Sequence, residues 1–526
     1  MTALIQAHTT AHANPFAASR ERFEQLVTEL TSPETLATTH SAIEALLHTQ
    51  GMALLCQMFQ DQLDLLAARE RPQVVVGAEG LARDRRRERD RALETRFGRV
   101  RLSRLSYEGE GVTSLRPLDA QLNLPVELYS YGVRRLAAEQ ASSVSFEAAQ
   151  ATIDSVSGAH VPKRQLEAIV ARAAEDFDAF YDLRAGAGPS AAAQTGSLVV
   201  LGADAKGVVM IREGLRPETR KAAEASARKR GRRLGPGEKL NGKRMAQVAS
   251  VHTAAPFVRT PEEVMHELLG APRLARTRPK AERKRVWASL EKEAGEVISA
   301  MFEEARTRDP DRQKAYVAVV DGNAHQLRSI EAEAEARKIE VRIVLDLIHV
   351  IEYLWRAAWV FHEKGKEGAV AAEGWVSARV LEVLRGRSSA VAGGIRRSAT
   401  LRQIAPAQRA AADTCANYLI DYGAYLRYDE YLAAGYPIAS GVIEGACRHL
   451  VQDRMDITGA RWSLGEAEAV LKLRSLRSSG DFDAYWGFHE RRLYERQHAA
   501  FYANSTVPVA EPTPRPGTRS ALRVVK

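Results

Sequence analysis

Three acidic residues stand where a metal-dependent phosphoryl-transfer site would need them. Asp204 ends an apolar run that begins at residue 197, and Asp321 ends another that begins at residue 315. Glu444 follows a turn rich in Pro, Gly and Ser, which is expected to open a helix. Carboxylate oxygens are the ligands that Mg²⁺ prefers. A pair of such ions can hold the attacking and leaving oxygens of an in-line phosphoryl displacement. The sequence therefore predicts two Mg²⁺ ions, with Mn²⁺ as an alternative, bound by Asp204, Asp321 and Glu444.

A fourth carboxylate competes for the middle position. Asp346 also ends an apolar, strand-like run, which begins at residue 341. Gly207 and Gly322 lie close behind Asp204 and Asp321, and a glycine at a strand end permits close backbone approach to a phosphate. We rank Asp321 above Asp346 and keep Asp346 as the alternative second ligand.

The elements that must position these residues form an α/β pattern. Strand-like runs begin at residues 198, 208, 246, 315 and 340, and residues 324–337 read as a charged helix between the last two. Residues 281–307 and 349–431 are helical in pattern. This order predicts a ribonuclease H-like mixed sheet built from residues 197–348 and 435–500. Residues 349–434 would be a helical insertion that precedes the Glu444 helix.

The region before this core is predicted to be mainly helical and to bind DNA. Residues 1–80 carry apolar side chains at spacings of three and four, typical of a core or a dimer seam. Residues 81–184 contain an arginine-dense stretch, a predicted hairpin around residues 97–105 and a helix-turn-helix pattern around Gly158. Lys163 and Arg164 lie in the first turn of the second helix, where a recognition helix presents donors to a groove. Simple packing of two helices is the alternative.

Positive charge is concentrated in one segment. The net charge is +9, and residues 216–244 hold eleven basic residues against three acidic ones. Such a block is typical of a segment that faces a polyanion, or of a solvated arm. The residues predicted to contact DNA phosphates here are Arg228, Lys229, Arg230, Arg232, Arg233, Lys243 and Arg244. Residues 505–526, with prolines and scattered basic residues, are predicted to form a disordered basic tail.

Composition excludes several classes of protein. No segment has the 18 uninterrupted apolar residues of a membrane helix, so no membrane partner is expected. The N-terminus lacks a basic start followed by an apolar stretch, which argues against secretion. The three cysteines, Cys56, Cys415 and Cys447, are too few and too widely spaced for a disulfide framework or a four-cysteine zinc site. The expected location is a reducing cytoplasm.

Several motifs together resemble the DDE transposases of bacterial insertion sequences. They are Gly202–Gly207, Val319–Asn323, Leu345–Trp355, Gly435–Val451 and Asp453–Trp462, of which the last two are especially similar to the ISKra-type group. The resemblance implies a ribonuclease H-like fold and Asp204, Asp321 and Glu444 as the metal-binding triad. Asp346 and His349 match a signature of Mutator-like relatives, which implies that His349 is a catalytic helper.

The same resemblance implies an activity and partners. The chain would bind double-stranded DNA at transposon ends and at a target, and would catalyse Mg²⁺-dependent strand cleavage and strand transfer. A homodimer or larger assembly on DNA is expected, associated with the bacterial nucleoid. Many relatives carry a cysteine-based zinc motif that this chain lacks, so DNA reading would depend on the hairpin and the helix pair. The alternatives are a ribonuclease H-like nuclease that cuts without joining and a domesticated DNA-binding protein.

Overall fold

Two compact units make up the chain. The computed structural model describes residues 14–186, 195–227, 242–270, 276–457 and 459–509. Unit 1 combines residues 1–176 with residues 483–526, and unit 2 is Phe177–Phe482. The predicted core boundary at residue 500 differs from this division, because the chain returns to unit 1 at Asp483. The five predicted DNA contacts from Arg228 to Arg233 and most of the predicted tail lie outside the described residues.

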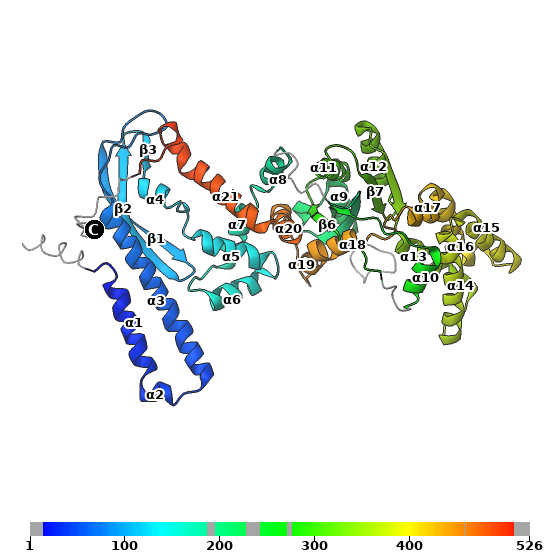
Figure 1. The fold of residues 1–526 in the computed structure, drawn as a ribbon, viewed down its shortest axis with the longest axis horizontal. Coiled ribbons are helices and arrows are strands. Elements are labelled where there is room, and N and C mark those ends of the chain that lie inside the picture. Colours follow the sequence, from blue (N-terminus) through cyan, green and yellow to red (C-terminus); the bar gives the residue numbers. More distant parts are fainter. Residues whose placement is uncertain (1–13, 187–194, 228–241, 271–275, 458, 510–526) are drawn as a thin grey trace, which may run out of the picture. The chain divides into compact units, whose positions relative to one another are not determined.

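Unit 1 is built on a three-stranded antiparallel sheet and a long helix. Its strands β1 (Arg85–Thr95), β2 (Gly98–Gly109) and β3 (Val112–Leu115) pair in the order β1-β2-β3. The hairpin is longer than the sequence indicated, since the arginine-dense stretch is itself strand β1. Helices α1 (Ala17–Leu30), α2 (Pro33–Leu36) and α3 (His40–Arg69) precede the sheet, and α3 lies along β2 (Figure 1).

Side chains of α3 satisfy the backbone of β2 where no strand pairs with it. The Gln60 amide donates to the Arg101 carbonyl at 2.9 Å and accepts from the Arg101 N–H at 2.8 Å. Glu70 accepts from the Leu105 N–H at 2.8 Å. These bonds replace a neighbouring strand and so protect this edge of the sheet.

Four short helices and the last long helix complete unit 1. They are α4 (Pro117–Gln121), α5 (Tyr131–Ala141), α6 (Phe146–Val156), α7 (Lys163–Ala173) and α21 (Phe482–Gln497). Helix α7 packs against α5 and α6, as a helix-turn-helix pattern requires. Helix α21 is joined to α7 by the buried Tyr485 hydroxyl, which donates to the Ala173 carbonyl at 2.6 Å.

Unit 2 contains a mixed five-stranded sheet, so the predicted α/β pattern is confirmed. The strands are β4 (Leu198–Val209), β5 (Lys243–Ala254), β6 (Glu282–Ser289), β7 (Ala315–Val320) and β8 (Val341–Leu345). They pair in the order β6-β5-β4-β7-β8, with β4, β5 and β6 antiparallel and β4, β7 and β8 parallel.

Two sequence-based assignments in this sheet were wrong. Residues 198–209 form one strand rather than two, because β4 pairs with β5 along its whole length. Residues 282–289 are a strand and not the start of a helix, because β5 offers them an open edge to pair with.

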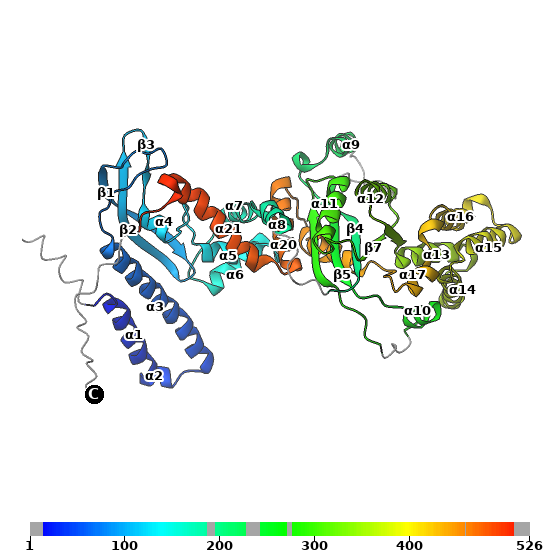
Figure 2. The same cartoon turned by 45° about the horizontal axis from the view of Figure 1, so that its top comes forward.

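Helices pack on this sheet and extend from its end (Figure 2). Helix α11 (Ala294–Arg306) packs on β4, β5 and helix α12 (Ala324–Arg337), and α20 (Leu464–Ser479) packs on β6. Between them in sequence comes a group of five helices, α13 (Leu347–Phe361), α14 (Lys366–Leu384), α15 (Ser388–Leu401), α16 (Pro406–Asp421) and α17 (Tyr428–Ala433). The chain then returns to the sheet through α18 (Gly441–Ala446), the π-helical turn η3 (Cys447–Gln452) and α19 (Asp453–Met455).

The remaining helices of unit 2 are α8 (Phe177–Gly186), α9 (Pro217–Ala227) and α10 (Pro261–Leu268). Within the described ranges, no helix is both long enough and apolar enough to span a bilayer.

Candidate functional site

The pairing of β4 with β7 gives Asp204 and Asp321 matching positions. The two strands run parallel, and their last paired residues are Gly202 and Val319. Asp204 and Asp321 each lie two residues further along, at a separation between neighbouring strands of about 4.8 Å. The sequence predicted that Asp204 would end its strand. This prediction was wrong, because β4 pairs with β5 as far as Val209. It is the pairing of β4 with the parallel strand β7 that ends before Asp204, at Gly202.

Gly202 allows the helix that carries Glu444 to approach the sheet. A Cβ atom at Gly202 would lie 2.6 Å from the Ser250 hydroxyl oxygen and 3.0 Å from the Ile443 Cβ. Ile443 is buried and directly precedes Glu444 on α18. A side chain at position 202 would therefore push α18 away from the sheet, so this glycine is needed for a close approach.

Cys447 contacts Asp204 from the same stretch of chain. Its thiol donates to Asp204 Oδ2 at 3.0 Å, while the Ala205 N–H donates to Oδ1 at 2.6 Å. Burial raises the pKa of the thiol, and the negative charges of Asp204 and Asp321 raise it further, so the thiol remains a hydrogen-bond donor. Cys447 also begins the π-helical turn, a feature found frequently at functional sites. The sequence analysis missed this contact, and its one signal was that Cys447 lies one helical turn after Glu444.

Negative charge accumulates around Glu444. Burial raises the pKa of this carboxyl group, and the carboxylates of Asp346 and Asp204 raise it further. His349 and Ser440 act in the opposite direction. His349 lies in the first turn of α13, half-buried, with its Nδ1 3.9 Å from the carboxylate of Glu352. The pKa of Glu444 is thus affected by Asp204, Asp346 and His349.

Asp346 is fully buried and uses both carboxylate oxygens within the protein. Its Oδ1 accepts from the Ile348 N–H at 2.7 Å, which caps helix α13. Its Oδ2 accepts from the Ser440 N–H at 2.7 Å and from the Ser440 hydroxyl. Asp346 therefore fixes the end of β8 to the turn that begins the Glu444 helix. Sequence analysis did not identify Ser440 as its partner.

Asp321 lies in a more open setting. Its side chain is half-buried, and Oδ1 accepts from the Asn323 N–H at 3.0 Å. Gly322 has φ of +92°, and a Cβ there would lie 3.3 Å from the Tyr418 hydroxyl oxygen. Tyr418 comes from helix α16, and its ring stacks on Tyr353 with centroids 4.1 Å apart.

The Tyr418 hydroxyl is buried beside this turn. No hydrogen-bond partner for it occurs among the residues that the structure describes. Burial raises the pKa of the phenol, and the neighbouring Tyr353 and Asp321 add to the effect. The group of helices α13 to α17 therefore contributes to the surroundings of Asp321.

The predicted DNA contacts that can be located differ in exposure. Lys163 and Arg164 are exposed at the start of α7, and Lys163 forms an ion pair with Glu147 of α6. Lys243 is exposed at the start of β5. Arg244 donates to the carbonyls of Leu290 at 2.7 Å and Gly214 at 3.1 Å, so its guanidinium supports the fold of unit 2.

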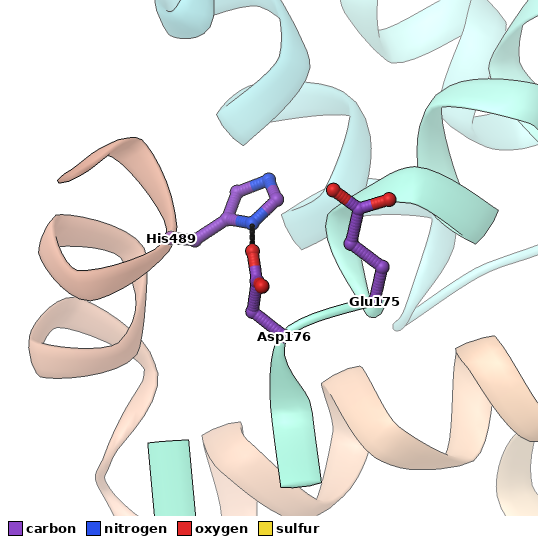
Figure 3. Close-up of side chains that lie close together, drawn as sticks. All are labelled: Glu175, Asp176 and His489. Carbon is purple, nitrogen blue, oxygen red and sulfur yellow. Dashed lines mark hydrogen bonds and ion pairs between the residues drawn. The ribbon is translucent and has the colours of Figure 1, made fainter. Parts of the chain in front are cut away.

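A second group of polar residues lies in unit 1 (Figure 3). Glu175, Asp176 and His489 are the one set in the described chain whose possible ligand atoms all lie within 4.8 Å of one another. His489 Nδ1 lies 2.6 Å from Asp176, and Arg496 donates to Asp176 at 2.5 Å and pairs with Glu175. Burial alone would raise the pKa of Asp176, but His489 and Arg496 lower it to about 2. Arg496 pairs with both carboxylates and His489 with one of them, so these contacts join α21 to the segment after α7.

Comparisons with known proteins add little. No family model matches the chain, and no curated protein matches it in sequence. Among solved structures, the Drosophila P element transposase strand transfer complex is similar with a TM-score of 0.24 and 11% identity. That alignment covers 71% of this chain and 82% of the other chain.

Proposed function

We propose that this chain is a DDE-type transposase that cleaves DNA at the ends of an insertion sequence and joins the freed ends to target DNA. One observation carries the proposal. Asp204 and Asp321 occupy matching positions beyond the last β4–β7 pair, and close packing at Gly202 brings the Glu444 helix to the same strand. The mixed five-stranded sheet, interrupted by a group of helices before Glu444, supports a ribonuclease H-like core.

The residues fit a pair of Mg²⁺ or Mn²⁺ ions. Asp204, Asp321 and Glu444 offer carboxylate oxygens, and none of the three forms an ion pair with a lysine or arginine in the described ranges. Burial is the main cause of the raised pKa of Glu444, and the carboxylates of Asp346 and Asp204 add to it; a bound cation would balance this negative charge. Within the described residues, the possible ligand atoms of these three carboxylates do not all lie within 4.8 Å of one another. When bound, the ions would supply an activated oxygen nucleophile and neutralise charge on the phosphate.

Asp321 is the better second ligand. Asp346 already accepts three hydrogen bonds at a fully buried position, whereas Asp321 is half-buried and accepts one at Oδ1. Moving Asp346 to a metal would leave the Ser440 and Ile348 N–H groups without their acceptor, at a cost of about 1–3 kcal/mol each. We therefore assign Asp346 to positioning the Glu444 turn.

The other residues orient groups or hold protons. Cys447 and the Ala205 N–H fix the orientation of the Asp204 carboxylate. His349 lowers the pKa of Glu444 and so favours its ionised form. Preorganised groups of this kind lower the barrier mainly by positioning and charge stabilisation.

Double-stranded DNA at the transposon ends and target is the proposed partner. Arg164 and Lys243 are exposed and could contact phosphates, and Lys163, which is also exposed, forms an ion pair with Glu147. The basic residues 228–233 would add to this charge, making affinity steeply dependent on salt. Joining two ends to one target requires two active sites, so a homodimer or larger assembly on the bacterial nucleoid is expected.

A strand-transfer assay tests the proposal. Purified protein is incubated with Mg²⁺, a labelled duplex that ends in the element's inverted repeat, and a supercoiled target. We expect cleaved and joined products, lost in Asp204→Asn and Glu444→Gln while binding is retained. Glu367→Gln, an exposed carboxylate on α14, is the matched control and should remain active. Cleavage without joining would favour a nuclease, and binding without cleavage a DNA-binding protein.

A further inference from the structure

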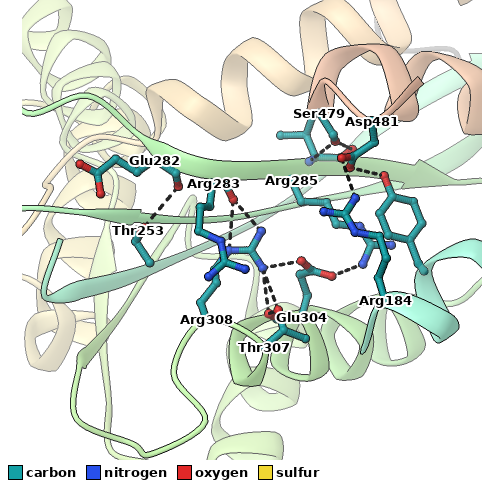
Figure 4. A network of polar contacts seen from close by, with 12 residues as sticks. Arg184, Thr253, Glu282, Arg283, Arg285, Glu304, Thr307, Arg308, Ser479 and Asp481 are labelled. Carbon is teal, nitrogen blue, oxygen red and sulfur yellow. Dashed lines mark hydrogen bonds and ion pairs between the residues drawn. The ribbon is translucent and has the colours of Figure 1, made fainter. Parts of the chain in front are cut away.

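A basic cavity of about 660 Å³ opens at the edge of the sheet in unit 2. Strand β6, helix α8 and the C-terminal ends of α11 and α20 surround it (Figure 4). Six of its lining residues are basic and two are acidic. The basic residues are Arg184, Arg283, Lys284, Arg285, Arg308 and Arg477, and the acidic residues are Glu304 and Asp481.

The inner cations are held by the acidic residues. Arg285 and Arg308 both form ion pairs with Glu304. Burial alone would raise the pKa of Glu304, but these two guanidinium groups lower it, so its carboxylate remains ionised. Arg184 pairs with Asp481 at 2.6 Å. Two carboxylates therefore pair with three arginines at the floor of the cavity, which leaves one net positive charge there.

The backbone at Arg283 is held in an unusual conformation. Its φ is +47°, in the left-handed region that non-glycine residues seldom adopt. Arg308, which is 7% exposed, donates to the Arg283 carbonyl from Nε at 3.1 Å and from Nη2 at 2.6 Å. Such a conformation persists only where surrounding contacts enforce it, and it occurs often at binding sites. The buried floor thus fixes the place from which the Arg283 side chain extends.

The outer cations at Arg283 and Lys284 are not balanced. Both residues are exposed, and neither forms an ion pair with a carboxylate in the described parts of the chain. The Ser478 hydroxyl lines the same cavity and can donate a hydrogen bond, whereas the Thr307 hydroxyl already donates to the Glu304 carbonyl at 2.7 Å. Cations at the opening, together with hydroxyl donors, are the groups that bind phosphate in proteins.

We propose that this cavity binds a phosphate of the DNA backbone, with Arg283 and Lys284 as its principal contacts. The inference rests on the proposed function and adds a DNA contact outside the carboxylate site. A backbone phosphate suits the cavity better than a free ion, because the unbalanced charge is at the opening and the volume far exceeds one phosphate.

Strand register gives the distance between the two sites. Arg285 pairs with Val251, which pairs with Leu201 on β4. From the level of these three paired residues, Arg283 and Asp204 lie in opposite directions along their strands. Strands β6 and β4 are also two positions apart in the sheet, so Arg283 and Asp204 are separated by roughly 20 Å. At about 3.4 Å per base pair, the cavity would bind a phosphate about six base pairs from the scissile one.

The salt dependence of DNA binding tests the inference. The double variant Arg283→Gln/Lys284→Gln removes two charges. The backbone carbonyl of residue 283 is unchanged, so it can still accept the hydrogen bonds from Arg308. The control, Lys364→Gln/Arg397→Gln, removes one exposed charge between α13 and α14 and one on α15. Affinity for a 30-base-pair end duplex is measured by fluorescence anisotropy at several salt concentrations, using Asp204→Asn proteins to prevent cleavage. The slope of log K against log salt should fall by about 1.8 in the cavity variant and stay unchanged in the control.

The outcomes separate this inference from the proposed function. If the parent protein does not bind the duplex, the proposed function itself fails. If it binds and the cavity variant has the parent slope, only the cavity inference is overturned. Pyrophosphate is added as a separate ligand, followed by thermal melting. Stabilisation of the parent but not of the cavity variant, with equal DNA slopes, would assign the cavity to a free phosphorylated molecule and would also overturn the inference.

Discussion

Replacing Asp346 and Asp321 in parallel separates a structural carboxylate from a metal ligand. In Asp346→Asn, one amide oxygen can still face Ser440, but the amide NH₂ then meets the Ile348 N–H, and two donors oppose each other. Loss of a helix cap costs about 1 kcal/mol, and weakening the two charge-assisted bonds adds about 2 kcal/mol. We expect a total destabilisation of roughly 3 kcal/mol.

Asp321→Asn should behave differently. The side chain is half-buried and accepts one hydrogen bond at Oδ1, from the Asn323 N–H, which an amide oxygen can also accept. Its effect on stability should stay within about 0.5 kcal/mol, as for most exposed substitutions. Strand cleavage and stabilisation by Mg²⁺ should both be lost.

Urea unfolding in chelator and thermal melting with increasing Mg²⁺ measure both effects. Asp346→Asn should unfold at lower urea and keep its Mg²⁺-dependent rise in melting temperature, whereas Asp321→Asn should show the reverse. The reasoning is refuted if Asp346→Asn has wild-type stability and no response to Mg²⁺ while Asp321→Asn still responds. Asp346 would then be the second ligand.

Three further predictions follow from buried or charged groups. Tyr418→Phe removes a buried hydroxyl without a described partner, so the melting temperature should stay equal or rise by the equivalent of about 1 kcal/mol; a clear fall would reveal a hidden partner. Glu444→Gln should raise the melting temperature of the metal-free protein at neutral pH, because the raised pKa of Glu444 means that its ionised form opposes folding. Equal melting temperatures for the variant and the wild type would contradict this. The folded pKa of Asp176 lies at about 2, below its ordinary value of 3.8. Its contribution to stability is therefore present above pH 4 and is lost as the pH falls toward 2. Between these pH values, the free energy of urea unfolding should fall by up to about 2 kcal/mol in the wild type and by less in Asp176→Asn; equal losses in both proteins would refute this prediction.

The sequence predicted most of the elements around the candidate site because their signals are local. The apolar runs before Asp321 and Asp346 define β7 and β8, and the turn before Glu444 opens a helix as expected. The sequence did not predict strand β6, and the reason is equally clear. Residues 282–285 are charged and carry no alternating pattern, so only the open edge of β5 made them a strand.

Local sequence patterns indicated the kind and order of the chemical groups: an acidic residue after an apolar run at Asp204 and again at Asp321, a third at the start of a helix at Glu444, and an excess of positive charge. The tertiary structure decided how each group is used. Asp346 became an internal acceptor because Ser440, 94 residues away, donates to it. Cys447 became a donor to Asp204 across 243 residues. Periodicity reports local backbone structure, whereas the pairing of distant residues depends on strand register and close packing, so the two nearly identical strand ends at Asp321 and Asp346 could be distinguished only in the folded chain.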